Sequence, residues 1–172
     1  MTTGNSAPAP EPRDVADHEA SHAVVWWWHV NQPNGFRVNN QGSYPYVTIK
    51  TRHGRDWGHF QSPDPLNMFD RTEFEQAVMS ALAGAAPDDI HKRHFLKAKQ
   101  EELWAAGAAV RLLGGSEHAT MTVRELRGRI RTLLERPEVR AMVDAVTAAL
   151  LKRETLSGAE AIAVMRQALG DT

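Results

Sequence analysis

The chain has 172 residues, of which 42% are hydrophobic, and a formal net charge of −1 at pH 7. This size and composition predict one globular domain, and they exclude a largely disordered chain and the basic footprint of a nucleic-acid-binding protein. The absence of cysteine excludes disulfides, thiolate metal ligands and a cysteine nucleophile, so any metal must be held by His, Asp or Glu.

The N-terminal residues 1–13 are rich in Pro, Ala and Thr and lack the basic start and apolar run of a signal peptide. We therefore expect a disordered tail here, followed by one domain over residues 14–172. No apolar stretch in the sequence approaches the roughly 18 residues that a membrane-spanning helix requires. These features predict a cytoplasmic protein with no membrane partner and no nucleic-acid partner.

The first predicted helix carries the letters HEASH, an HExxH box that begins at His18 and ends at His22. Asp14 can cap this helix, and no Pro or Gly interrupts the apolar run that follows the box. The two histidines are one helical turn apart, so both imidazoles can reach one zinc ion. Glu19 is then placed to take a proton from a metal-bound water. The alternative interpretation is an ordinary helix with two surface histidines.

His29 lies on the same predicted helix face as the box, seven residues after His22. The segment between them has no glycine at which the chain could turn back toward the metal. A continuous helix would carry His29 about 10 Å from His22, too far to share one ion. We therefore interpret His29 as a residue that faces solvent or the mouth of the site.

Strands are predicted after the first helix. Residues 36–38 and 46–51 alternate in the manner of strands, and a turn then leads into a hairpin partner at 57–60. Within this partner, Trp57 and His59 could stabilise an oxyanion or line a pocket, or could be ordinary turn and core residues.

The pattern becomes helical from residue 72 onward. Thr72 and Glu75 match a capping box for a helix that ends near Gly84. A further helix is expected over residues 88–113.

Three more helix starts follow in the C-terminal third. Thr122 with Glu125, and Ser157 with Glu160, match capping boxes, and Pro137 is suited to the first turn of a helix. The predicted fold class is therefore α+β and mainly helical. It comprises a zincin-like HExxH helix with a small sheet, followed by a C-terminal helical bundle.

Taken in this order, the features resemble the zinc peptidase domain of the FtsH-type membrane AAA proteases. Residues 15–25 look like that family's box, with Ser21 where a glycine is usual. Residues 47–58 look like its strand and hairpin beside the active site, and residues 82–86 look like its second core helix, which ends in a small-residue motif. Residues 150–158 are similar to its closing helices.

This resemblance implies a third zinc ligand, an acidic residue early in the long helix after the small-residue motif. Counted without gaps, the position falls on Glu102, where the family has an aspartate. A register shifted by one turn leaves His94 as a competitor, with Glu101 and Asp89 as further candidates. The implied ligand set for Zn²⁺ is His18, His22 and Glu102.

The predicted function is that of a zinc-dependent metallopeptidase-like hydrolase in which Glu19 activates a zinc-bound water. The family couples its peptidase to an ATP-driven unfoldase and a membrane anchor, but the 172 residues contain neither a GxxxxGKS/T phosphate loop nor a spanning helix. We therefore expect the substrate to be a peptide or an unfolded protein segment. A separate ATPase or a second copy of the chain is a candidate partner.

The substrate is expected to lie along the exposed edge of the strand near residues 47–51, where it would add a strand through main-chain hydrogen bonds. Two other functions remain open. One is a repurposed metal-dependent enzyme that acts on a small molecule in a biosynthetic tailoring step, and the other is a non-catalytic interaction protein. The intact Glu19 argues against the second, because an inactive protein does not need this carboxylate.

Overall fold

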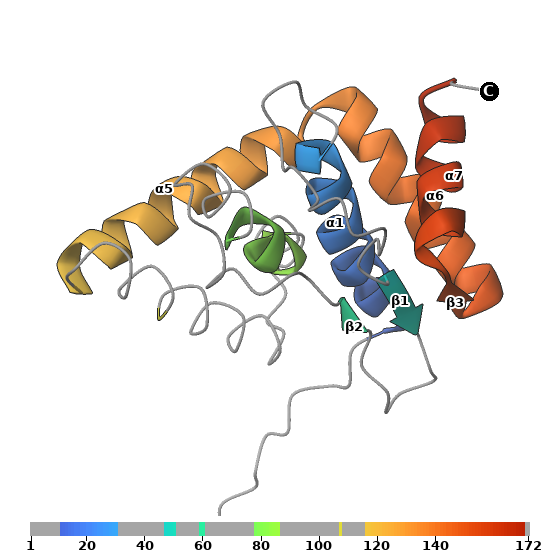
Figure 1. The fold of residues 1–172 in the computed structure, drawn as a ribbon, viewed down its shortest axis with the longest axis horizontal. Coiled ribbons are helices and arrows are strands. Elements are labelled where there is room, and N and C mark those ends of the chain that lie inside the picture. The colour runs from blue at the N-terminus through green and yellow to red at the C-terminus, as the bar shows by residue number, and fades with distance from the viewer. Residues whose placement is uncertain are drawn as a thin grey trace, which may run out of the picture.

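The computed structural model describes residues 11–30, 47–50, 59–60, 78–86, 107 and 116–170. Over these residues the fold is mainly helical, as the sequence predicts, and none of the helices in them is long and apolar enough to cross a membrane (Figure 1). We refer to residues 78–86, which are helical throughout and include a short 3-10 turn, as the 78–86 segment. The elements are α1 (Pro12–Val30), β1 (Val47–Lys50), β2 (His59–Phe60), η2 (Ala83–Ala85), α5 (Ser116–Leu134), α6 (Pro137–Arg153), β3 (Thr155–Leu156) and α7 (Gly158–Ala168).

Helix α1 is the central element of the described fold. It contacts η2 and the helices α5, α6 and α7, as well as β1 and β2. In Figure 1, α1 (blue) lies between the 78–86 segment (green) and α6 (orange). All residues from 16 to 27 are buried, which is typical of a helix covered on every side. The HExxH box therefore lies inside the domain.

The start of α1 differs from the sequence prediction. The helix begins at Pro12, two residues before the predicted cap, because proline has a suitable φ angle and needs no hydrogen-bond partner in the first turn. Asp14 lies at the third helical position, where its carboxylate accepts a hydrogen bond of 3.3 Å from the Glu11 backbone N–H. Asp14 therefore stabilises the start of the helix from inside the first turn.

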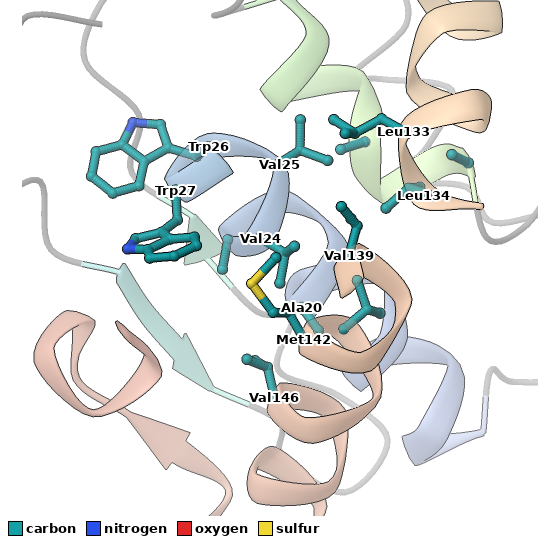
Figure 2. Close-up of a cluster of buried hydrophobic side chains, with 14 of the residues drawn as sticks. Ala20, Val24, Val25, Trp26, Trp27, Leu133, Leu134, Val139, Met142 and Val146 are labelled. Atoms are coloured by element: carbon teal, nitrogen blue, oxygen red, sulfur yellow. The ribbon is translucent and has the colours of Figure 1, made fainter. Parts of the chain in front are cut away.

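The hydrophobic core is built around the C-terminal half of α1. Val24 packs on the side of α6 that carries Met142, whereas Val25 points toward Leu133 and the end of α5 (Figure 2). Trp27 points away from both helices. The side chains of α1 thus fill the space between several elements at once, and this holds the box that precedes them in a fixed place.

The three C-terminal helix starts have different outcomes. Pro137 opens α6, and Ser157 caps α7 in a complete capping box with Glu160, so both predictions are confirmed. The prediction for Thr122 is wrong, because α5 begins at Ser116. The six residues before Thr122 contain no Pro or Gly, and adding a turn to an existing helix costs less than starting one.

The three strands form one small antiparallel sheet with the order β2-β1-β3. Val47 pairs with Phe60 and Thr48 with His59 on one side of β1, and Lys50 pairs with Thr155 on the other. The central strand β1 therefore has partners along both of its sides.

Strand β3 was not predicted, because residues 150–158 were assigned to closing helices. Helix α6 ends instead at Arg153, and its C-cap residue Glu154 has a left-handed backbone with φ of 62° that turns the chain into the strand. Leu156 is fully buried and pairs with Ile49 of β1. A strand of two residues has almost no local signal, so its position depends on this long-range pairing.

Candidate metal centre

His18 and His22 lie side by side in the interior of the domain. Only 1% of His18 and 2% of His22 is exposed. Their Nε2 atoms are 3.3 Å apart, and the two rings are nearly perpendicular, with an interplanar angle of 86°. The interpretation as two surface histidines is therefore wrong for this chain.

The separation of the two nitrogens matches the geometry of a zinc site. Zinc binds histidine nitrogens at about 2.0–2.1 Å with tetrahedral angles, which puts two such nitrogens about 3.3 to 3.4 Å apart. The observed Nε2···Nε2 distance of 3.3 Å agrees with this value. The distance between the two nitrogens is thus the one that a shared zinc ion would require.

A second contact fixes the protonation of His22. Its Nδ1 atom is 2.6 Å from the backbone carbonyl oxygen of Ser80. A carbonyl can only accept, so Nδ1 carries the proton and the lone pair of the neutral ring is on Nε2. Metal-binding histidines commonly donate their second N–H to a carbonyl in this way. The Ser80 carbonyl of the 78–86 segment therefore fixes the orientation of the His22 ring.

Glu19 is buried beside the two histidines, with an exposed fraction of 1%. It precedes His22 by three residues, so the two side chains lie on neighbouring parts of the helix surface. Burial of a carboxylate is costly unless hydrogen bonds or an opposite charge compensate it. A cation at the histidine pair would supply such a charge.

Two further polar residues of the box region are buried and hydrogen-bonded. The carboxylate of Asp17 accepts a hydrogen bond of 2.9 Å from the Thr147 hydroxyl of α6. The Ser21 hydroxyl donates to the Asp17 backbone carbonyl at 2.8 Å. Ser21 therefore satisfies its hydroxyl within the helix at a position where the FtsH-type box has glycine.

The third ligand predicted from the sequence lies outside the described residues. This applies to Glu102 and equally to its competitors His94, Glu101 and Asp89. Within the part of the chain that the structure describes, no group of three His, Asp or Glu side chains could hold a metal. The structure thus brings together two of the three predicted ligands.

The two hairpin candidates are only partly described. His59 lies on β2 and pairs with Thr48 of β1 through the backbone, whereas Trp57 lies outside the described residues. Both assignments remain predictions.

The prediction that His29 faces solvent or the mouth of the site is corrected in its first part, because His29 does not face solvent freely, and its second part remains a prediction. It lies near the C-terminal end of α1 and is partly buried, and its Nε2 atom is buried without a hydrogen-bond partner among the described residues. Desolvation by burial lowers the pKa of His29 from 6.5 to about 4. The imidazole is therefore neutral at physiological pH.

The sheet also differs from what the substrate hypothesis requires. The sequence predicts an exposed strand edge near residues 47–51, but β1 is the central strand and is paired on both sides. A peptide could add to this strand only where these short pairings end. The sheet gives no support to strand addition along the whole of β1.

Searches of protein-family models and of curated proteins give no match to this chain.

Sequence reasoning did not anticipate the roles of Ser80 and Thr147. Both act on the box from elements far along the chain, at separations of 58 and 130 residues from their partners His22 and Asp17. The carbonyl of Ser80 is a backbone group, so no residue type could have indicated it. For Thr147, a threonine within an apolar helix face was the only available signal.

Proposed function

We propose that this chain is a zinc-dependent hydrolase in which His18, His22 and Glu102 hold the ion and Glu19 moves the proton. The observation that carries the proposal is the 3.3 Å separation of two buried Nε2 atoms, one of them oriented by the Ser80 carbonyl. The HExxH spacing and the resemblance to the FtsH-type peptidase domain support the same assignment.

The residues of the chain would divide the work as follows. A zinc ion in this position supplies a Lewis acid that makes a water more acidic and polarises a carbonyl. Glu19 would accept the proton of the attacking water and return it to the leaving group. The hydrogen bond of Thr147 to Asp17 ties the helix that carries Glu19 to α6. This hydrogen bond holds the box in one position relative to α6.

The resemblance favours a peptide or an unfolded protein segment as the substrate, cleaved at an amide bond. A peptide needs an open groove and a free strand edge, and the described structure offers little of either. His18 and Glu19 are each 1% exposed, and β1 is paired on both sides.

The burial of the box favours a second candidate, a metal-dependent enzyme that acts on a small molecule. A small substrate can react in an enclosed site that excludes water, whereas a polypeptide cannot enter one without a large opening. The two candidates share the metal centre and differ in access to it.

Metal analysis of protein purified without chelator tests the centre. We expect about one zinc per chain in the wild type and loss of zinc in His22→Ala. His29→Ala is the matched control, because it removes an imidazole from the same helix without touching the pair. Zinc retained by His22→Ala at the level of His29→Ala would show that the box is not the site.

The third ligand is tested by a pair of variants. Glu102→Ala should lower zinc affinity by roughly 10-fold or more, because loss of the carboxylate leaves only two neutral imidazoles to bind a divalent cation. The helical content measured by circular dichroism should not change. His94→Ala should keep its affinity. The reverse pattern would assign the third position to His94 and make the site one of three neutral imidazoles.

The substrate class is tested by an assay on two kinds of substrate, with one inactive variant as the control. Zinc-loaded protein is assayed on a quenched-fluorescence peptide library and on small amide and ester substrates, with Glu19→Gln as the blank. Cleavage of peptides alone supports the peptidase, and cleavage of small substrates alone supports the second candidate. If Glu19→Gln matches the wild type on every substrate, the hydrolase proposal fails.

A further inference from the structure

Gly84 of η2 lies directly against the two imidazoles. A Cβ atom placed on Gly84 would be 2.7 Å from both Nε2 and Cε1 of His18, and closer still to Nε2 of His22. Real Cβ atoms essentially never come within 3.0 Å of another heavy atom in this way. The absence of a side chain at Gly84 thus leaves open the space in front of both nitrogens.

The backbone gives no reason for a glycine at this position. Among the described residues, the only glycine with a positive φ is Gly170. Glycine in a helical segment is about 0.5–1 kcal/mol less favourable than alanine. Gly84 therefore has a conformational cost that its own backbone does not explain.

Close approach of two helices is the usual packing reason for a glycine, and the contacts here are of another kind. The three nearest atoms to a Cβ at Gly84 all belong to the rings of His18 and His22, and none is a backbone atom. The rings have little freedom to move aside, because both are buried and His22 is held by Ser80 in the same segment. A side chain at residue 84 would compete with anything that the two nitrogens bind.

We infer that Gly84 is a positioning residue of the metal centre, and that its missing side chain admits the ion between His18 and His22. This inference rests on the proposed zinc site and adds a residue that does not ligate the metal. The 78–86 segment then acts twice, because Ser80 fixes the donor atom of His22 and Gly84 keeps clear the space in front of it.

The test compares Gly84→Ala with Gly128→Ala, the same substitution at a glycine of α5 where a Cβ would meet nothing within 4 Å. Zinc stoichiometry is measured by elemental analysis, affinity by competition with a chelator, and coordination by the visible absorption of the Co²⁺-substituted protein. We expect Gly84→Ala to lose roughly 10-fold to 100-fold in affinity and to change the cobalt spectrum. Gly128→Ala should match the wild type in both.

A triple variant keeps the test valid if Gly84→Ala is poorly folded. The three nearest atoms to the new Cβ all belong to the rings of His18 and His22, so Gly84→Ala/His18→Ala/His22→Ala removes every one of them. The triple variant should therefore unfold at the same urea concentration as His18→Ala/His22→Ala. If the triple variant unfolds at a clearly lower urea concentration, the glycine serves backbone packing and the inference is wrong.

The outcomes for zinc separate the inference from the proposed function. If the wild type and Gly84→Ala both bind one zinc with equal affinity, the metal centre stands and the role of Gly84 is refuted. If the wild type binds no zinc, both are refuted. Binding by the wild type and Gly128→Ala, with loss in Gly84→Ala, supports both.

Discussion

Helix α1 contains two successive buried parts, residues 17–22 and residues 23–27. The two parts are buried to a similar extent, but the first has mostly polar side chains and the second has only apolar ones. The first part, which we call the polar half, contains the box, and all of its residues other than Ala20 are polar. The second, the apolar half, contains alanine, valine and tryptophan. Apolar burial stabilises a fold by about 25 cal/mol per Å², whereas polar burial at best offsets its own desolvation. The apolar half is therefore expected to contribute more to stability, and the polar half carries the residues that we propose for the metal centre.

The largest expected effect concerns the polar half. Glu19→Gln keeps the size of the side chain but cannot accept a proton. We expect kcat/KM of the zinc-loaded enzyme to fall roughly 100-fold to 10,000-fold, with the thermal midpoint and the zinc content unchanged. A midpoint that falls together with the activity would mean that the carboxylate serves the fold, and the contrast between the halves would fail.

The next effect concerns the packing of the apolar half. Met142 of α6 is fully buried and belongs to the same hydrophobic cluster as Val24 (Figure 2). Met142→Ala should lower the free energy of unfolding by about 2–5 kcal/mol, because it removes apolar contacts and leaves a cavity. Urea unfolding measures the loss, and elemental analysis should still find zinc in the folded protein. Loss of zinc at conditions where the variant is fully folded would show that the two halves are coupled.

A pH effect is expected at His29, two residues after the apolar half. Burial lowers the pKa of His29 to about 4 in the folded protein, against 6.5 for an exposed histidine. The unfolded chain therefore binds more protons than the folded one between these values. The stability gained from the neutral ring is complete above pH 6.5 and is lost as the pH falls to 4, by up to about 3 kcal/mol.

Urea unfolding of the wild type and His29→Leu at several pH values between 4 and 7 measures this contribution. The variant should lose less stability than the wild type as the pH falls, because leucine does not titrate. Identical pH profiles for the two proteins would refute the role of His29.

The smallest effect concerns the attachment of the polar half to α6. Thr147→Val keeps the shape of the side chain but removes the donor to the Asp17 carboxylate, and should cost about 1–3 kcal/mol. Thr132→Val is the matched control, because the Thr132 hydroxyl donates to a backbone carbonyl on the exposed surface of α5. It should change stability by less than about 0.5 kcal/mol. Equal effects of the two substitutions would show that the buried hydrogen bond contributes no more to the free energy of unfolding than the exposed one.

Some features of this chain follow from local sequence. The box helix, the start of α6 at Pro137 and the capping box of Ser157 were all predicted, because each depends on spacing or on residue types within a few positions. The predicted start of α5 at Thr122 was wrong, since a capping motif does not end a helix that can continue through it. Local signals thus identified most helices but not all of their ends.

The tertiary structure decided what surrounds the box. His22 is oriented by the Ser80 carbonyl, and the space before it is set by Gly84, which the sequence indicated only as the end of a helix. Strand β3 and the burial of His29 likewise depend on contacts with distant segments. The sequence by itself determined that the ring nitrogens of two histidines, the proposed metal ligands, lie one helical turn apart on one helix. Only the packing of α1 against the 78–86 segment and α6 decided that these atoms meet in a buried, oriented pair, because that arrangement depends on side chains and carbonyls far away in the chain.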